Sequence, residues 1–163
     1  MDQLNLANNL VSANQGEENE TTQYIVVRLG QEQYGIDIKY VENIVRMQQI
    51  TRVPKVPSYI KGVINLRGEV IPVMSIRIRM GLPEDEITRA TRIIILKLEQ
   101  DGTVGYLVDE VKEVVTLESR DIEKMSRDTL DTSQNFINGV GKRGNELISL
   151  LDLNSISIED NIG

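Results

Sequence analysis

The chain of 163 residues contains no cysteine and no histidine. Without cysteine it can form no disulfide, no cysteine-ligated zinc site and no iron–sulfur cluster, and it has no thiol nucleophile. Without histidine it lacks the commonest general base and the commonest metal ligand. These two absences remove a large share of enzyme chemistry and leave carboxylates as the main groups to consider.

Aromatic residues, excess positive charge and long apolar runs are also missing. The chain has one phenylalanine, five tyrosines and no tryptophan, and its net charge is −7. An acidic chain without a basic stripe or an aromatic platform is not expected to bind nucleic acid. No apolar run approaches the ~18 residues of a membrane span, and residues 1–20 lack the apolar core of a signal peptide. We therefore expect a soluble, cytoplasmic protein with no direct membrane insertion.

The most distinctive stretch is residues 62–76, GVINLRGEVIPVMSI. Two β-branched runs separated by Arg67 and Gly68 predict a β-hairpin, in which Gly68 supplies the positive φ of a tight turn. Arg67 places a charge at the tip of an otherwise apolar hairpin. It is either a solvated turn residue or an arginine directed at a carboxylate on a partner.

This stretch occurs twice. Residues 136–153 repeat residues 59–76 at a constant offset of 77, and residues 105–115 repeat residues 35–45 at an offset of 70. Two units with the same order of elements indicate an internal duplication. We predict a flexible tail over 1–20, a first unit over 21–81, a connection over 82–91 and a second unit over 92–158.

The pattern of elements predicts an all-β fold with short helices. Short strands at close spacing with turn residues between them favour small barrels, so we expect two similar five-stranded β-barrels packed together. The apolar run at 93–96 predicts a strand buried on both faces. The remaining local predictions are helical spacing over 39–46, whose second half also suits a strand; a short helix over 76–80 capped by Ser75; and a helical turn over 122–125.

Two patterns suggest chemistry and are interpreted otherwise. Residues 139–144 read GVGKRG, which matches GxGxxG, but no helix is predicted after them, so we assign hairpin glycines and expect no cofactor. Asp109, Glu110 and Glu113 form one acidic cluster and residues 84–86 another. We interpret both as solvated surface and expect no catalytic pair and no metal site.

With these chemical sites set aside, the predicted function is binding through the protein surface. A groove between the two units would suit an amphipathic helix of a partner. The repeat makes Val41 equivalent to Val111 and Ile44 equivalent to Val114. These four residues are predicted to line the groove, although aliphatic residues at such spacing equally suit an ordinary core.

The segments QYGIDI, TRVP, YIKGVINLRGEVIPV and GYLVDEVKEVV together resemble the CheW family of chemotaxis coupling proteins, over about residues 22–156. The resemblance implies one CheW-like domain made of two SH3-like five-stranded barrels. It also implies an adaptor that joins the regulatory domain of the histidine kinase CheA to the cytoplasmic hairpin tip of chemoreceptors, recruited to membrane-associated receptor arrays.

In this family a receptor helix lies in the groove between the barrels, and kinase contact is attributed to the surface of the first barrel, to which no residue is assigned here. The second barrel is expected to add a contact that builds rings. Asn43 stands where the family often has an acid, and Ser75 where it has aspartate. The positions implied for the receptor groove are Val41, Asn43, Gly62, Arg67, Val111 and Val114.

We therefore predict a non-enzymatic adaptor that couples chemoreceptors to CheA. Two other functions remain open at this point. One is a regulatory domain that binds only a kinase, and the other is an enzyme that depends on carboxylates.

Overall fold

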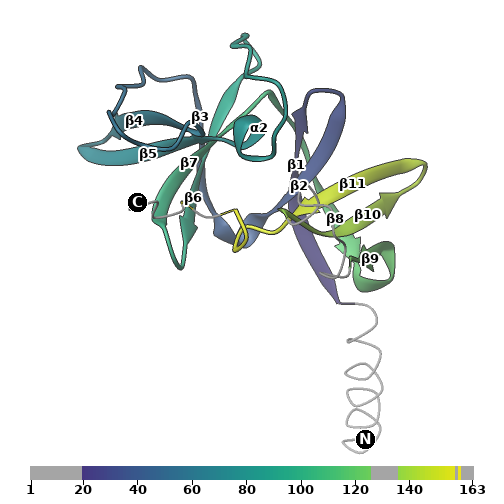
Figure 1. The fold of residues 1–163 in the computed structure, drawn as a ribbon. Helices are drawn as coiled ribbons and strands as arrows, with labels where there is room; N and C mark the ends of the chain where they lie inside the picture. The colour runs from purple at the N-terminus through teal and green to yellow at the C-terminus, as the bar shows by residue number, and fades with distance from the viewer. Residues whose placement is uncertain (1–19, 126–135, 157, 159–163) are drawn as a thin grey trace, which may run out of the picture.

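The computed structural model describes residues 20–125, 136–156 and 158, which form two β-sheets lying side by side (Figure 1). The predicted tail over 1–20 falls almost entirely outside these residues. Sheet A has the strand order β8 (Glu110–Glu118), β1 (Thr21–Leu29), β2 (Glu32–Asp37), β11 (Glu146–Leu151), β10 (Ile137–Arg143) and β9 (Ile122–Lys124). Sheet B has the order β3 (Val41–Arg46), β6 (Arg92–Leu98), β7 (Gly102–Val108), β5 (Glu69–Ser75) and β4 (Ile60–Leu66). Within the described residues, short helices join the strands at η1 (Ile38–Tyr40), α2 (Ile76–Arg79) and η2 (Ser119–Asp121).

The predicted all-β fold with short helices is confirmed, but the predicted unit boundaries do not match the sheets. The hairpin β1–β2 of the first repeat pairs with β8 and β11 of the second repeat. In the same way, the hairpin β6–β7 of the second repeat pairs with β3 and β5 of the first. The units over 21–81 and 92–158 therefore describe the duplication and not the two barrels, because each repeat exchanges its first hairpin with the other.

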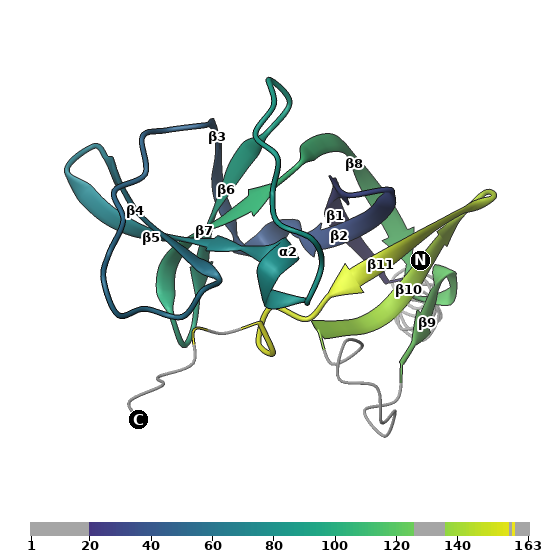
Figure 2. The same cartoon turned by 45° about the horizontal axis from the view of Figure 1, so that its top comes forward.

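The structure supports the repeat itself at the level of single hydrogen bonds. The backbone N–H of Ser75 donates to the carbonyl of Tyr59 at 2.7 Å, and that of Asp152 donates to the carbonyl of Phe136 at 2.8 Å. Both residues of the second bond lie 77 positions after those of the first. The hairpins β4–β5 and β10–β11 are accordingly equivalent, and they project at opposite ends of the molecule (Figure 2).

Most predictions for single elements are confirmed. The Oγ atom of Ser75 accepts a hydrogen bond from the N–H of Ile78 at 3.1 Å and so caps α2. The helical prediction over 39–46 is wrong for most of the segment, because η1 ends at Tyr40 and β3 occupies Val41–Arg46; the strand alternative for the second half is confirmed. Residues 139–144 lie in the β10–β11 hairpin and are followed by a strand, as predicted. The helical turn over 122–125 is wrong, because Ile122–Lys124 pair with β10 as the short sixth strand of sheet A.

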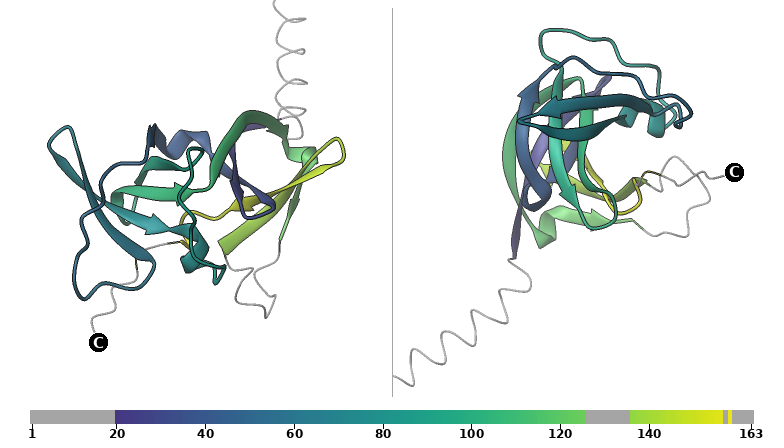
Figure 3. Two further views of the ribbon diagram at one scale, coloured as in Figure 1. Left: turned by 90° about the horizontal axis from the view of Figure 1, so that it is seen from above. Right: turned by 90° about the vertical axis from the view of Figure 1, so that its left-hand side faces the viewer.

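The described residues form three clusters of buried side chains, of which two lie within one sheet each, while the largest takes residues from both sheets and holds them together. We call it the central cluster; β1, β2, β6 and β7 all contribute to it. The strand β6 shows how the clusters connect, because Ile94 and Leu96 face the central cluster while Ile93 and Ile95 face the interior of sheet B. The prediction that this run is buried on both faces is confirmed. Figure 3 shows the two sheets from two further sides.

Candidate protein-binding surface

The tip of the β4–β5 hairpin carries an arginine in an unusual backbone conformation. Leu66 pairs with Glu69, so Arg67 and Gly68 are the two central residues of the turn. Their φ angles are 54° and 84°, and two successive positive φ angles define a type I′ turn. The side chain of Asn65 supports the turn by accepting a hydrogen bond from the N–H of Gly68 at 3.0 Å. Glycine or asparagine is preferred at such positions, and an arginine there is disfavoured.

The second copy of the hairpin has a glycine at the position of Arg67. Gly144 lies 77 positions after Arg67 and has a φ of 61°. The duplication therefore has glycine where the backbone requires a positive φ, and the first hairpin has an exposed arginine in its place. Arg67 is therefore an exposed side chain at a backbone conformation that disfavours arginine.

Gly62 is buried and has a structural reason to be glycine. Its φ is 142°, and a Cβ atom at this position would lie 2.2 Å from the carbonyl oxygen of Thr51. Thr51 and Val63 exchange two backbone hydrogen bonds of 2.8 Å each across this contact. Gly62 thus brings the connection before β4 against the hairpin that carries Arg67.

The strands β3 and β8 occupy equivalent edges of the two sheets. Val41 and Val111 are partly buried and pack against the central cluster, whereas Ile44 is 36% and Val114 is 50% exposed. Val41 and Val111 therefore belong largely to the core, whereas Ile44 and Val114 are exposed on the edge strands. Asn43 is exposed, and its Oδ1 atom accepts a hydrogen bond from the N–H of Ile44 at 2.8 Å.

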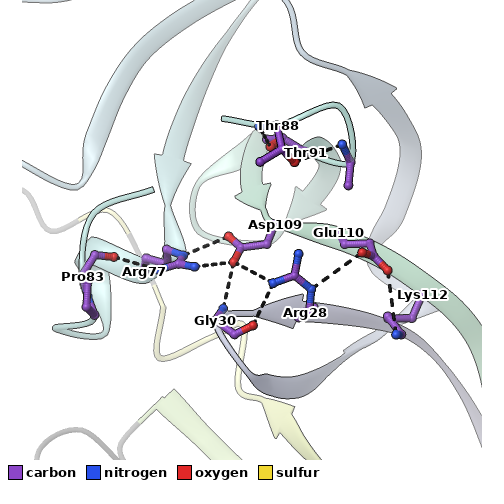
Figure 4. A network of polar contacts seen from close by, with 10 residues as sticks. Arg28, Gly30, Arg77, Pro83, Thr88, Thr91, Asp109, Glu110 and Lys112 are labelled. Carbon is purple, nitrogen blue, oxygen red and sulfur yellow. Dashed lines mark hydrogen bonds and ion pairs between the residues drawn. The ribbon is translucent and has the colours of Figure 1, made fainter. Parts of the chain in front are cut away.

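A buried ionic network holds the start of β8 (Figure 4). Asp109 connects β7 of sheet B to β8 of sheet A, and only 7% of it is exposed. Its carboxylate accepts hydrogen bonds from Arg77 of α2, with 2.9 Å between Nε and Oδ1, and from the N–H of Gly30 at 2.8 Å. The Nη1 atom of Arg28, on β1, lies 3.5 Å from the Oδ2 atom of Asp109. The prediction that Asp109 belongs to solvated surface is therefore wrong.

The same network reaches the exposed part of β8. The Nε atom of Arg28 lies 3.7 Å from Glu110, which is also 3.8 Å from the ammonium of Lys112. Glu113 is exposed, as predicted, and pairs with Arg143 at 2.7 Å. Since Asp109 and Glu110 directly precede Val111, the network fixes the part of β8 that carries two of the predicted groove residues.

The pKa of the Asp109 carboxyl results from opposing effects. Burial raises this pKa, but the hydrogen bonds from Arg77 and Gly30 and the charges of Arg77 and Arg28 outweigh burial and lower it below its usual value. The carboxylate is consequently ionised at neutral pH, as the network requires.

We expect the contribution of Asp109 to stability to depend on pH. Because its pKa is lower in the folded than in the unfolded state, the contribution is present above the unfolded value of about 3.9 and is lost as the pH falls further. The variant Asp109→Asn should therefore be less stable than wild type by about 2 kcal/mol at pH 7, with the difference narrowing below about pH 4. Urea unfolding of both proteins from pH 7 to pH 3 measures this. A difference that stays constant across that range would contradict the assignment.

Arg79 adds a second connection between the two repeats. Its guanidinium carbon lies 4.8 Å from the ring centre of Tyr59 and 4.9 Å from that of Phe136. These two rings occupy equivalent positions of the duplication, since they are 77 residues apart. A guanidinium over aromatic faces is an attractive contact, so Arg79 joins the segments that precede β4 and β10.

The acidic side chains of the described residues are the remaining candidates for metal binding or catalysis. Among them no group of three or more aspartate and glutamate side chains is arranged to hold a metal ion. In the acidic cluster over 84–86, Glu84 and Glu86 are exposed, while Asp85 accepts a hydrogen bond from Ser75. In the same part of the chain, no helix has the length and apolar character needed to cross a membrane.

Comparison with known proteins gives one consistent result. The family model of the CheW-like domain matches residues 23–160. The chain is 40% identical to the chemotaxis protein CheW of Bacillus subtilis over 81% of this chain and 84% of that protein, and 32% identical to the chemotaxis protein CheW of Helicobacter pylori over 90% and 87%. The crystal structure of the scaffolding protein TtCheW from Thermoanaerobacter tengcongensis superposes with a TM-score of 0.77 at 32% identity, covering 85% of this chain and 94% of that one.

Proposed function

Because the chain belongs to the family of CheW-like domains and is a chemotaxis scaffold, we propose that it is a non-enzymatic adaptor that couples chemoreceptors to the histidine kinase CheA. It acts in the cytoplasm, at receptor arrays on the membrane. One partner is the cytoplasmic hairpin tip of a chemoreceptor, and the other is the regulatory domain of the kinase.

The observation that carries the receptor part of this proposal is the conformation of Arg67. An exposed arginine at positive φ, in a turn whose duplicate has glycine, is expected where the side chain serves a partner. In the proposed complex Arg67 pairs with a carboxylate of the receptor tip and sets the register of the receptor helix, since charged pairs determine orientation and partner choice.

The apolar part of the receptor surface is assigned to the edge strands β3 and β8. Ile44 and Val114 supply exposed side chains, and Val41 and Val111 continue from this surface into the central cluster. Asn43 lies beside Ile44 on β3, and Gly62 shapes the approach to the hairpin. The kinase contact is assigned to the surface of the first barrel without individual residues.

We expect Arg67→Gly to separate binding from folding. Glycine adopts the positive φ of the turn freely, so the free energy of unfolding should stay the same or increase. Binding of a soluble receptor cytoplasmic fragment should weaken about tenfold or more, as for a charged residue central to an interface. Calorimetric titration with that fragment and thermal unfolding of the same samples measure both quantities.

The matched control is Lys142→Gly, which removes an exposed positive charge close to the tip of the equivalent β10–β11 hairpin and away from β8. It should leave receptor binding close to wild type. Receptor binding by Arg67→Gly at the wild-type affinity would refute the role of Arg67. A wild-type protein that binds the kinase domain but no receptor fragment would refute the coupling function.

A further inference from the structure

Three arginines gather beside the β3–β6 pair of sheet B, and the described residues give none of them an acidic partner. Arg46 of β3, Arg92 of β6 and Arg89 before β6 line a shallow pocket of about 410 Å³, together with Met47, Thr88 and Thr91. Arg46 stands directly opposite Arg92 in the antiparallel register of β3 and β6. None of the three arginines forms an ion pair with a residue that the structure describes, and we call them the arginine cluster.

This arrangement is unfavourable for the isolated protein. Like charges directly opposite each other on neighbouring strands are destabilising. The chain has 25 acidic residues against 18 basic ones, so an acidic neighbour would be easy to provide. Groups kept at a cost in stability are expected at functional sites.

The chemistry of the cluster defines its ligand. Guanidinium groups are planar and bind carboxylates through two parallel hydrogen bonds. The guanidinium group of Arg92 is held within the protein, because it donates 2.8 Å hydrogen bonds to the carbonyls of Arg89 and Thr91. The side chains of Arg46 and Arg89 are exposed. Arg46 and Arg89 are thus the arginines available to a carboxylate from outside.

The cluster continues the proposed receptor surface along β3. Side chains alternate between the two faces of a strand, and Val45 packs against the interior cluster of sheet B. Its neighbours Ile44 and Arg46 both point away from that interior and are exposed. An exposed aliphatic side chain and an exposed arginine therefore lie next to each other on the outer face of the same strand.

We propose that the arginine cluster anchors aspartate or glutamate side chains of the receptor helix whose aliphatic residues contact Ile44, an inference that rests on the proposed function. The partner segment is accordingly a helix with an aliphatic stripe flanked by carboxylates. The side chains of Arg46 and Arg89 bind the carboxylates, and Arg92 positions Arg89 by donating a hydrogen bond to the backbone carbonyl of Arg89.

The test uses the full chain with a soluble receptor cytoplasmic fragment and, separately, the kinase regulatory domain. Arg46→Glu places an acid opposite Arg92, so the melting temperature should stay the same or rise. Receptor binding should nevertheless weaken about tenfold, and further in the double variant R46E/R89E. Binding of the kinase domain should be unchanged. The decrease of receptor affinity with added salt should be shallower in the double variant than in wild type.

The matched control is Lys97→Glu, which makes the same change of charge at an exposed position of β6. It should bind the receptor fragment as wild type does. If R46E/R89E binds the fragment as tightly as wild type while Arg67→Gly does not, the anchor is refuted and the proposed function stands. Equal effects of R46E and Lys97→Glu, or a loss confined to the kinase domain, would also refute the anchor. A wild-type chain that fails to bind the fragment refutes both.

Discussion

The variant Arg77→Leu is expected to lose about 3–5 kcal/mol of unfolding free energy. The change removes the side chain that makes two hydrogen bonds to Asp109 and leaves a carboxylate with 7% exposure beside an apolar group. Arg28 at 3.5 Å and the N–H of Gly30 still face this carboxylate, but its main partner is gone. Breaking a buried ion pair is strongly destabilising, whereas an exposed ion pair contributes little. Urea unfolding at pH 7 measures the loss.

Two further variants make this result specific to the buried pair. Arg143→Leu removes the partner of Glu113 in a pair whose side chains are 50% and 44% exposed, and it should cost at most about 1 kcal/mol. The double variant Arg77→Leu/Asp109→Leu removes both charges and should recover part of the loss, because no buried charge then remains. A single Arg77→Leu variant as stable as Arg143→Leu would show that the network does not hold the barrels together.

The variant Gly62→Ala is expected to cost about 2–4 kcal/mol. Alanine is strained at a φ of 142°, and its Cβ would lie 2.2 Å from the carbonyl oxygen of Thr51. The backbone around Thr51 must therefore move, which breaks the two hydrogen bonds that it exchanges with Val63. Receptor binding should also weaken, because the same movement displaces the hairpin that carries Arg67.

The duplicate again supplies the control. A Cβ atom at Gly139 would lie 3.1 Å from the carbonyl oxygen of Glu123, and Gly139 itself does not have a positive φ. Gly139→Ala should therefore cost about 1 kcal/mol. The unfolding free energies of both variants measure the contrast. Equal losses would mean that the close approach at Thr51 is not what makes Gly62 necessary.

Features that depend on local sequence could be predicted well. The run over 93–96 and the cap at Ser75 each follow from the chemistry of a few neighbouring residues, as does the turn at Gly68. The duplication carries a further local signal. An offset of 77 aligns Arg67 with Gly144, and this alone indicates a positive φ at Arg67.

Features that depend on pairing between distant segments could not be predicted. In a duplicated chain each first hairpin has two chemically similar edges to pair with, one in its own repeat and one in the other, and the sequence does not distinguish them. The burial of Asp109 follows from that choice, because it brings Gly30 and Arg77 together. The pairing of Arg46 with Arg92 follows from it too, since β3 and β6 belong to different repeats.

The exchanged hairpins also bear on the origin of the molecule and on how it can be divided. Each barrel contains strands from both repeats, so neither half of the chain holds a complete barrel. Two identical ancestral subunits that swapped their first hairpins would have had the same contacts, and joining them through the connection over 82–91 gives the present topology. If the chain were cut within residues 82–91, each fragment would lack the strands that pair with its first hairpin. The two fragments would then fold by associating with one another.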